Sequence, residues 1–449
     1  MPAPAPFALL LALQESPPAP AIVPADTAWM LASTALVLLM TPAVAFFYGG
    51  LVRAKNALNT MMMCVGSFAT VGVLWALAGY SLAFNGSGRW VGGLQNVFLN
   101  GVGIEAHGTI PHLLFMSYQG TFAIVTAVLI AGAVVERMRF GAYLAFIALW
   151  SLVVYAPVAH WVWGGGWLSQ LGVLDYAGGT VVHINAGIAA PIAALLVGSR
   201  KDFGRQAVLP HNVPFVLLGT SLLYFGWFGF NSGSALAANG AAVVAFTNTL
   251  LAPMSCLAVW MALDALRTRR ATAVGAATAL VIGLVVITPA AGYVSPMSAL
   301  VIGALGAVPS YFAIVWRART RLDDSLDVLA GHGVGGISGA LLTGVFADAR
   351  WGGTNGLLFG HPAQLWLQLV GVLATIAYSA ALTVVVLKVV GVLTPLRAVT
   401  RAEGVGMDIT QHGEEAYAEG EGAVLVFREP HAGHAAPSTV GETAAVGAA

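Results

Sequence analysis

The sequence predicts an all-α polytopic membrane protein, and three observations carry this prediction. Hydrophobic residues make up 58% of the 449 positions and charged residues 8%, against roughly 25% charged residues in an average soluble domain. Several apolar runs, such as TAWMLASTALVLLMTPAVAFF, approach or exceed the ~20 residues that a helix needs to cross a bilayer. These runs are continuous, whereas the strands of a membrane barrel alternate between apolar and polar residues.

Eleven transmembrane helices are expected after an N-terminal segment. Residues 1–22 contain a short apolar core and then prolines, which is typical of a signal sequence, although the usual basic start is missing. The hydrophobic pattern predicts spans near residues 27–50, 57–84, 111–135, 140–162, 178–199, 212–232, 241–265, 272–290, 296–316, 324–346 and 363–391. These spans are interpreted as one domain over residues 24–396.

The basic residues predict how the chain is oriented in the membrane. Lysine and arginine are retained in short cytoplasmic loops. Of the 19 lysines and arginines, all except Arg89 and Arg350 fall on one side of the eleven-span arrangement. This distribution places the N-terminus outside and the C-terminus in the cytoplasm, and it requires an odd number of spans.

The 54 glycines and a repeated motif predict a tightly packed bundle with an internal duplication. In the fifth and the tenth span an aspartate precedes a histidine by eight residues, and a glycine follows by four. The two copies are Asp175, His183, Gly187 and Asp324, His332, Gly336. One copy enters from outside and the other from inside, as in an inverted five-plus-five repeat followed by a final long helix. Eight helical residues rise about 12 Å, so both histidines are expected near the membrane midplane.

His183 and His332 are the main candidates for a functional site. An ionisable side chain inside the membrane is costly and usually faces a cavity or a partner. The alternative is a core histidine that bonds to a backbone or hydroxyl oxygen. Two adjacent imidazoles can share one N–H and leave their outer nitrogens for a small molecule. Such a pair would titrate as a coupled unit.

Several other functions lack the residues that they require. A catalytic zinc takes about three protein ligands, and no HExxH motif or cysteine cluster accompanies the histidines. No GxSxG motif indicates a serine nucleophile. The net charge is zero and no basic cluster alternates with aromatic residues, so nucleic acid is not an expected partner. We expect no cofactor and no enzymatic activity.

Aromatic residues form a second candidate site near the ends of three spans. They occur in YQGTF (118–122), HWVWGGGW (160–167) and GWFGFNSGS (226–234). Tryptophan and tyrosine often serve as anchors at the membrane interface. Ring faces also attract small cations, by up to ~2 kcal/mol or more when the cation is desolvated. A cup of rings with the hydroxyl of Ser234 could therefore select a cation that donates hydrogen bonds.

Together these motifs resemble the Amt/Mep/Rh family of ammonium transporters, on the Amt branch. The resemblance covers residues 24–417 and implies the ammonium transporter fold. It rests on ADTAWML (25–31), FFYGGLVRAKN (46–56), VVERMRF (134–140), VWGGG (162–166), DYAGGTVVHINAG (175–187), GWFGFNSGSA (226–235), LDDSLDV with GHGVGG (322–336) and GMDITQHGEEAY (406–417).

The resemblance implies an outer site that recruits ammonium. Trp163, Phe122 and Ser234 would bind the cation, with Tyr118 beside them. Asp175 would support this site structurally, as a carboxylate that accepts backbone N–H groups at the start of span five. The presence of Trp163 and Ser234 favours the Amt branch over the Rh branch.

The resemblance also implies a gate and a pore below the outer site. Phe122 and Phe230 would form the gate, and His183, His332 and Trp227 would line the pore. Ammonium would lose its proton near Phe230 and cross as ammonia, with methylammonium as a transported analogue. Two alternatives stay open: a membrane ammonium sensor without substantial flux, and a structural or gas-conducting channel.

Partners and location are implied by the same resemblance. The protein would be a homotrimer in the cell membrane, the inner membrane of a bacterium, surrounded by lipid and with one pore per subunit. A PII-type signalling protein would bind at the cytoplasmic face. Residues 397–417 resemble the regulatory C-terminal segment of the family, whereas residues 418–449 depart from it and are predicted to be disordered.

Overall fold

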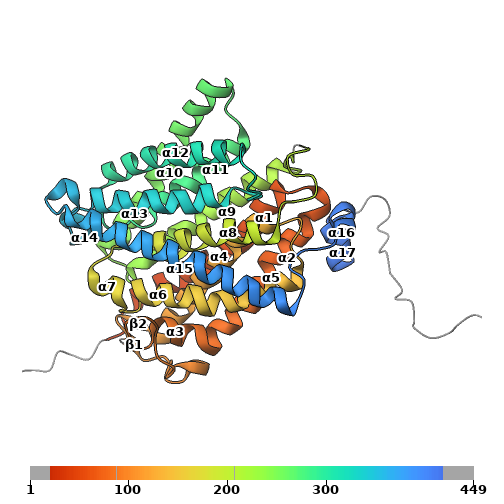
Figure 1. The fold of residues 1–449 in the computed structure, drawn as a ribbon. Coiled ribbons are helices and arrows are strands. Elements are labelled where there is room, and N and C mark those ends of the chain that lie inside the picture. The colour runs from red at the N-terminus through yellow and green to blue at the C-terminus, as the bar shows by residue number, and fades with distance from the viewer. Residues whose placement is uncertain (1–20, 87, 207, 418–449) are drawn as a thin grey trace, which may run out of the picture.

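The described part of the chain is a bundle of long helices (Figure 1). The computed structural model describes residues 21–86, 88–206 and 208–417. In these ranges ten helical segments are long and apolar enough to cross a membrane. A shorter apolar helix, α11 (Ala273–Ile287), lies where the eighth span is expected. The predicted all-α polytopic fold is therefore confirmed, while residues 1–20 of the expected signal sequence and the tail 418–449 lie outside the described residues.

The first half of the bundle contains five spans, several of which are built from more than one helical piece. Its helices are α1 (Pro24–Leu51), α2 (Ala57–Ser67), α3 (Tyr80–Phe84), α4 (His112–Val134), α5 (Phe140–Trp150), α6 (Ala156–Val162), α7 (Trp167–Leu171) and α8 (Asn185–Val197). π-helical segments at Phe68–Gly72, Trp75–Gly79, Ser151–Tyr155 and Gly179–Ile184 connect or extend these helices. A hairpin of β1 (Ala106–His107) and antiparallel β2 (Ile110–Pro111) lies at the same end as α7 (Figure 1).

The second half repeats this arrangement and ends in a long additional helix. Its helices are α9 (Val213–Ser232), α10 (Gly240–Thr268), α11, α12 (Pro296–Arg317), α13 (Gly335–Phe346), α14 (Ala349–Gly352) and α15 (Ala363–Leu393). A π-helical segment, Leu329–Val334, leads into α13 as Gly179–Ile184 leads into α8. The first spans of the two halves, α1 and α9, pack along each other.

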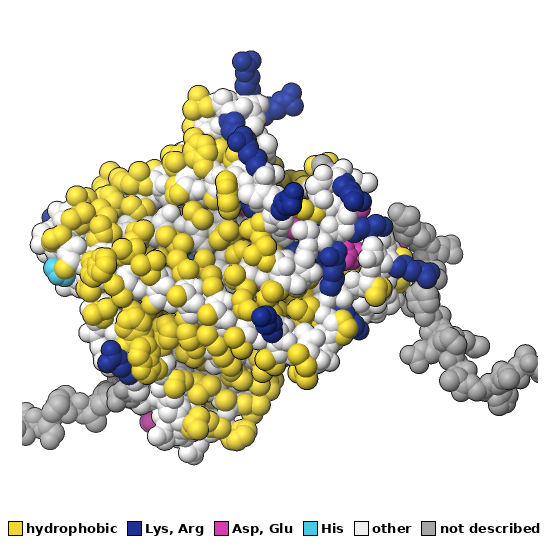
Figure 2. All heavy atoms as spheres, viewed as in Figure 1, with side chains coloured by type: hydrophobic (Ala, Val, Ile, Leu, Met, Phe, Trp, Pro, Cys, Tyr) yellow, Lys and Arg dark blue, Asp and Glu magenta, His cyan; other side chains and the backbone are white. Residues whose placement is uncertain are grey.

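The outer surface of the bundle is suited to lipid. Figure 2 shows hydrophobic side chains spread broadly over the visible face of the helices. Large apolar side chains such as Phe225, Phe312 and Leu373 are more than half exposed. The lysines and arginines on this face gather mainly toward α16 (Thr400–Val405) and α17 (Met407–His412) and on the projecting end of α10 (Figures 1 and 2). This surface fits a multi-pass membrane protein.

The C-terminal segment packs against the start of α2. The carboxylate of Asp408 accepts hydrogen bonds from the backbone N–H groups of Leu58 at 3.0 Å and Asn59 at 2.7 Å. The N–H of Met407 donates to the side-chain oxygen of Asn56 at 2.8 Å. A carboxylate at a helix N-terminus satisfies free N–H groups and interacts favourably with the helix dipole. Asp408 therefore caps α2 from a segment about 350 residues away in sequence.

A buried ion cluster lies at the same end of the bundle. Glu136 accepts from Arg53 at 3.0 Å and from Arg200 at 2.8 Å, and Arg200 also pairs with Asp323 at 2.7 Å. Burial by itself would raise the pKa of Glu136, but the hydrogen bond from Arg53 and the charge of Arg200 lower it from 4.5 to about 2. The buried carboxylate therefore stays ionised between its two arginines.

Replacing Glu136 with glutamine is expected to destabilise the protein at neutral pH. The lowered pKa corresponds to about 3 kcal/mol, as an order of magnitude. Because the folded-state pKa is depressed, this stabilisation is present above about pH 4.5 and is lost as the pH falls toward about 2. Thermal unfolding in detergent measures the effect. Asp202→Asn, which removes a more exposed partner of Arg53, serves as the control and should change the midpoint much less.

Candidate functional site

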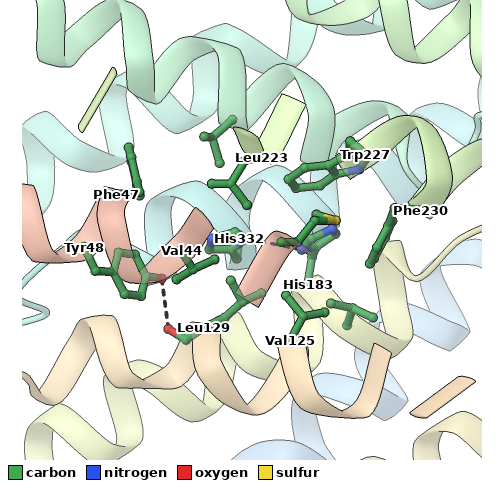
Figure 3. Close-up of a pocket in the computed structure, with 13 residues that line it drawn as sticks. Val44, Phe47, Tyr48, Val125, Leu129, His183, Leu223, Trp227, Phe230 and His332 are labelled. Carbon is green, nitrogen blue, oxygen red and sulfur yellow. Dashed lines mark hydrogen bonds between the residues drawn. The ribbon is translucent and has the colours of Figure 1, made fainter. Parts of the chain in front are cut away.

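The two predicted histidines lie side by side in the centre of the bundle (Figure 3). The Nδ1 atoms of His183 and His332 are 3.2 Å apart, and the ring centroids are 5.2 Å apart at 19°. An Nδ1 to Nδ1 hydrogen bond needs a proton on one nitrogen and a lone pair on the other. In a neutral pair the two Nε2 atoms therefore differ: one carries a proton and the other a lone pair. The Nε2 of His183 has no hydrogen-bond partner among the described residues.

Glycines allow the elements that carry the histidines to touch. A Cβ on Gly187 would overlap the backbone of Gly333, which follows His332 directly. At the equivalent place in the other copy, a Cβ on Gly336 would lie 2.9 Å from the carbonyl oxygen of Gly179. The glycine of each repeated motif thus contacts the element that carries the opposite histidine. This crossing brings the two imidazoles within hydrogen-bond distance.

A small apolar cavity lies beside the histidine pair. Its volume is about 20 Å³, which is enough for one molecule of the size of water. Besides the histidines it is lined by Met40, Val44, Phe47, Tyr48, Val125, Leu129, Val182, Leu223, Trp227, Phe230 and Val281 (Figure 3). Trp227 stacks on His183 with ring centroids 5.5 Å apart at 19°. The cavity therefore offers apolar walls and very few polar groups.

Two stacked phenylalanines close one end of this cavity. The rings of Phe122 in α4 and Phe230 in α9 are 4.2 Å apart at 22°. Both side chains are at most 1% exposed. Phe230 also lines the histidine cavity, whereas Phe122 lines a larger cavity on the other side. A molecule that passes between the two cavities has to displace these rings.

The larger cavity beyond the phenylalanines is lined by three of the four residues predicted for the outer site, Phe122, Trp163 and Ser234. It has a volume of about 260 Å³ and is lined by Phe84, Phe115, Gln119, Phe122, Val162, Trp163, Tyr176, Ser234 and Leu236. Trp163 stands edge-on to Phe122 at 5.8 Å. The hydroxyl of Ser234 donates to the carbonyl of Phe230 at 2.9 Å, which leaves an oxygen lone pair free to accept. Rings and an acceptor oxygen therefore share one cavity.

Tyr118 does not line this cavity. It is 1% exposed, and its hydroxyl donates to the carbonyls of Gly229 at 3.0 Å and Phe230 at 2.9 Å. The same hydroxyl lies 3.3 Å from the oxygen of Ser234. Tyr118 thus fastens α4 to the end of α9 from behind the cavity wall.

Asp175 lies beneath the cavity and is fully occupied by backbone groups. Its carboxylate accepts from the N–H groups of Gly178, Gly179, Thr180 and Val181 at 2.7–3.0 Å. Its backbone carbonyl accepts the indole N–H of Trp163 at 2.9 Å. Four strong bonds use the acceptor positions of the carboxylate, so Asp175 does not offer a ligand to the cavity. Its position instead fixes the start of the His183 element and the ring of Trp163.

The second copy of the motif is not identical to the first. The tenth span begins at Leu329 and not at Asp324. The carboxylate of Asp324 accepts from the N–H of Leu329 at 2.7 Å. Burial and the charge of Asp327 raise the pKa of Asp324 to about 6. Asp324 is therefore satisfied by fewer backbone donors than Asp175.

Gln119 also lines the aromatic cavity, although the sequence does not predict it as a binding residue. It is 8% exposed, and its side-chain oxygen has no hydrogen-bond partner among the described residues. A buried amide oxygen without a partner is unusual. The only signal in the sequence is a polar residue between the aromatic residues of YQGTF.

A third cavity reaches the histidines from the opposite end and has a volume of about 640 Å³. Its walls are mostly apolar, but they include His332 and the charged side chains of Arg200, Arg317 and Asp327. The guanidinium of Arg317 is 2.6 Å from the carboxylate of Asp327. The histidine pair thus lies between this cavity with charged groups on one side and the phenylalanine pair on the other. The described residues contain no group of three or more side chains suited to a metal ion.

The fold and these cavities define a multi-pass helical membrane protein with a small buried chamber between two larger cavities. The sequence profile of the Ammonium Transporter Family matches residues 28–417. The chain is 45% identical over 398 residues to an ammonium transporter of Bacillus subtilis, which covers 87% of this chain and 98% of that protein. The chain therefore belongs to the ammonium transporter family, which confirms the resemblance to the Amt branch.

Solved structures agree with this family assignment. The crystal structure of Mep2 from Candida albicans has a TM-score of 0.79 and 38% sequence identity, and it covers 83% of this chain and 85% of that chain. A structure described as a Sensor Amt Protein has a TM-score of 0.81 at 28% identity, over 86% of this chain and 98% of that chain. The predicted ammonium transporter fold is thus confirmed.

Proposed function

We propose that this protein transports ammonium across the membrane by recruiting the cation, removing its proton and conducting ammonia. Membership of the ammonium transporter family supports the substrate. The observation that carries the mechanism is the pair of imidazoles, with nitrogens 3.2 Å apart, in a cavity that holds about one small molecule. The substrate is not chemically changed overall, so the protein is a transporter and not an enzyme.

Recruitment is assigned to the aromatic cavity. The faces of Trp163 and Phe122 attract a cation through their ring quadrupoles. Ser234 keeps an oxygen lone pair beyond its bond to Phe230, and no described residue bonds to the amide oxygen of Gln119, so both can accept hydrogen bonds from N–H groups. Potassium has the same charge as ammonium and a similar size, but it has no hydrogens to donate. The combination of rings and acceptor oxygens therefore favours ammonium and methylammonium over potassium.

Removal of the proton follows from the cost of burying a charge. An isolated ammonium ion would lose hydration worth tens of kcal/mol in an unrelaxed apolar medium, and the cavity beside the histidine pair is too small to hold a hydration shell. Ammonia is neutral and meets a far smaller penalty. Deprotonation near Phe230 is therefore the step that allows passage. The proton goes to water in the aromatic cavity, and ammonia takes up a proton from water again on the other side of the membrane.

The histidine pair gives ammonia hydrogen-bond partners in an otherwise apolar chamber. Because the two imidazoles share one proton, one outer nitrogen accepts from an ammonia N–H and the other donates to the ammonia lone pair. Placing a positive charge on both rings in this buried place is prohibitive. The proposed role of His183 and His332 is therefore to bind neutral ammonia.

Orientation and partners are part of the same proposal. The distribution of lysine and arginine supports an outer N-terminus and a cytoplasmic C-terminus. In that orientation the aromatic cavity opens outside, and α16 and α17 lie in the cytoplasm. We propose a homotrimer in the cell membrane and a PII-type partner at the cytoplasmic face, on the strength of the family resemblance.

Uptake of labelled methylammonium into liposomes that contain the purified protein tests the proposal. We expect wild-type uptake above empty liposomes, and a fall of at least about tenfold in Phe230→Ala, because the ring at which the cation sheds its charge is gone. Phe225→Ala, on the exposed surface of α9 at 59% exposure, is the control and should transport normally. Equal uptake by all three proteins would contradict the proposed gate.

A membrane ammonium sensor is the second candidate function, because a structure described as a Sensor Amt Protein shares the fold. A sensor would retain the aromatic cavity and bind methylammonium. It would show no uptake above empty liposomes in the same assay. Binding without uptake would therefore replace transport with sensing.

A further inference from the structure

The last membrane helix, α15, carries polar side chains on its buried face although it lies outside the inverted repeat. These side chains are Gln364, Gln368, Thr375, Ser379 and Thr383, and each is at most 2% exposed. An amide in an apolar environment costs several kcal/mol unless its hydrogen bonds are made. The partners of these side chains therefore indicate what α15 holds in place.

Every donor and acceptor position of the Gln368 amide makes a hydrogen bond, and these bonds reach two parts of the bundle outside α15. Its oxygen accepts from the N–H of Leu174 at 2.7 Å, and its nitrogen donates to the carbonyl of Leu174 at 2.7 Å and to that of Ala340 at 3.1 Å. The nitrogen of Gln364 donates to the same oxygen at 3.3 Å and to the carbonyl of Gly172 at 3.0 Å. An inverted amide would face two carbonyls with its oxygen, so the network fixes its orientation.

Both partners of Gln368 belong to the elements of the pore. Leu174 directly precedes Asp175, whose carbonyl accepts the indole N–H of Trp163. The carboxylate of Asp175 caps the element that carries His183. Ala340 lies in α13, which continues from the element of His332. One buried amide thus joins the loop behind the aromatic cavity to the second half of the repeat.

We propose that Gln368 is a positioning residue, which holds the backbone at Leu174 so that Asp175 keeps the ring of Trp163 in place for cation recruitment. The inference rests on the proposed recruitment of ammonium in the aromatic cavity. Gln368 touches no substrate in this arrangement. Its loss therefore acts on the affinity of the outer site more than on passage through the pore.

The test measures the concentration of labelled methylammonium that gives half-maximal uptake and the maximal rate of uptake, with the purified protein in liposomes. We expect Gln368→Leu to raise the half-saturating concentration about tenfold, because several buried bonds are lost, and to lower the maximal rate of uptake less than about twofold. Gln364→Leu, which removes the bond to Gly172 but leaves both bonds to Leu174, should give a smaller shift of about threefold.

Ser379→Ala is the matched control. Ser379 lies on the same buried face and makes one bond, to the carbonyl of Asn185 at 2.8 Å, away from the aromatic cavity. Its half-saturating concentration should stay within about twofold of wild type. Equal shifts in Ser379→Ala and Gln368→Leu, or a loss of the maximal rate of uptake in Gln368→Leu with unchanged half-saturation, would overturn the positioning role.

A separate measurement distinguishes failure of this inference from failure of the proposed transport. Equilibrium binding of labelled methylammonium to the purified protein needs no flux. If wild type binds methylammonium but takes none up into liposomes, transport is wrong, and weaker binding by Gln368→Leu than by Ser379→Ala still supports positioning. If both variants bind as wild type does, positioning is wrong whatever the flux.

Discussion

The double variant His183→Ala, His332→Ala is expected to lose the selectivity for ammonium over potassium. In wild type the stacked rings of the two histidines occupy most of the chamber and leave room for about one small molecule. Removing both rings enlarges the chamber to a size that admits several waters, and a hydrated cation then meets a much smaller penalty. We expect the ratio of methylammonium uptake to potassium uptake to fall at least about tenfold relative to wild type.

Uptake of labelled methylammonium or labelled potassium at equal concentration, into liposomes that contain the purified protein, measures this ratio. The single variant His183→Ala tests whether the histidine pair only binds neutral ammonia or also carries the released proton across the membrane. If a proton follows the histidines, His183→Ala loses both the ammonium-evoked current and methylammonium uptake. Retained selectivity in the double variant would show that the phenylalanine pair and the aromatic cavity discriminate alone, and the proposed role of the imidazoles would fall.

The membrane spans are largely predictable from the sequence because they depend on local composition. The ninth span was expected at 296–316 and is Pro296–Arg317. The start of the tenth span is less predictable: the sequence places it at Asp324, whereas the helical segment begins at Leu329. Asp324 accepts an N–H from the start of that segment, and hydropathy does not distinguish a capping carboxylate from a residue inside the span.

The site is predictable only where a residue is chemically unusual for its surroundings. Histidines in apolar spans attract notice for that reason, and so do clustered aromatic residues. The roles of Gln119 and Gln368 cannot be predicted in this way, because they depend on the cavity or the distant backbone groups that each amide contacts in the folded protein. The same holds for Val125 and Val281, which line the chamber although the chain has many similar valines.

Gly187→Ala is expected to reduce ammonium transport at least about tenfold at equal amounts of protein in the membrane. A Cβ at Gly187 would overlap the backbone next to His332, and backbone cannot move aside as a flexible side chain can. The two elements must then separate, which breaks the 3.2 Å contact between the Nδ1 atoms. The chamber would widen at the proposed binding site for ammonia.

Gly331→Ala provides the matched control for this substitution. Gly331 lies in the same helical segment as His332, but a Cβ there would meet nothing within 4 Å. Both variants lose the same backbone freedom of a helical glycine, so a difference between them isolates the contact at the crossing. Methylammonium uptake into liposomes, normalised to folded protein measured by size-exclusion chromatography, is the readout. Because the crossing places both imidazoles at once, normal uptake by a well-folded Gly187→Ala protein would mean that the spacing of the histidines does not govern conduction.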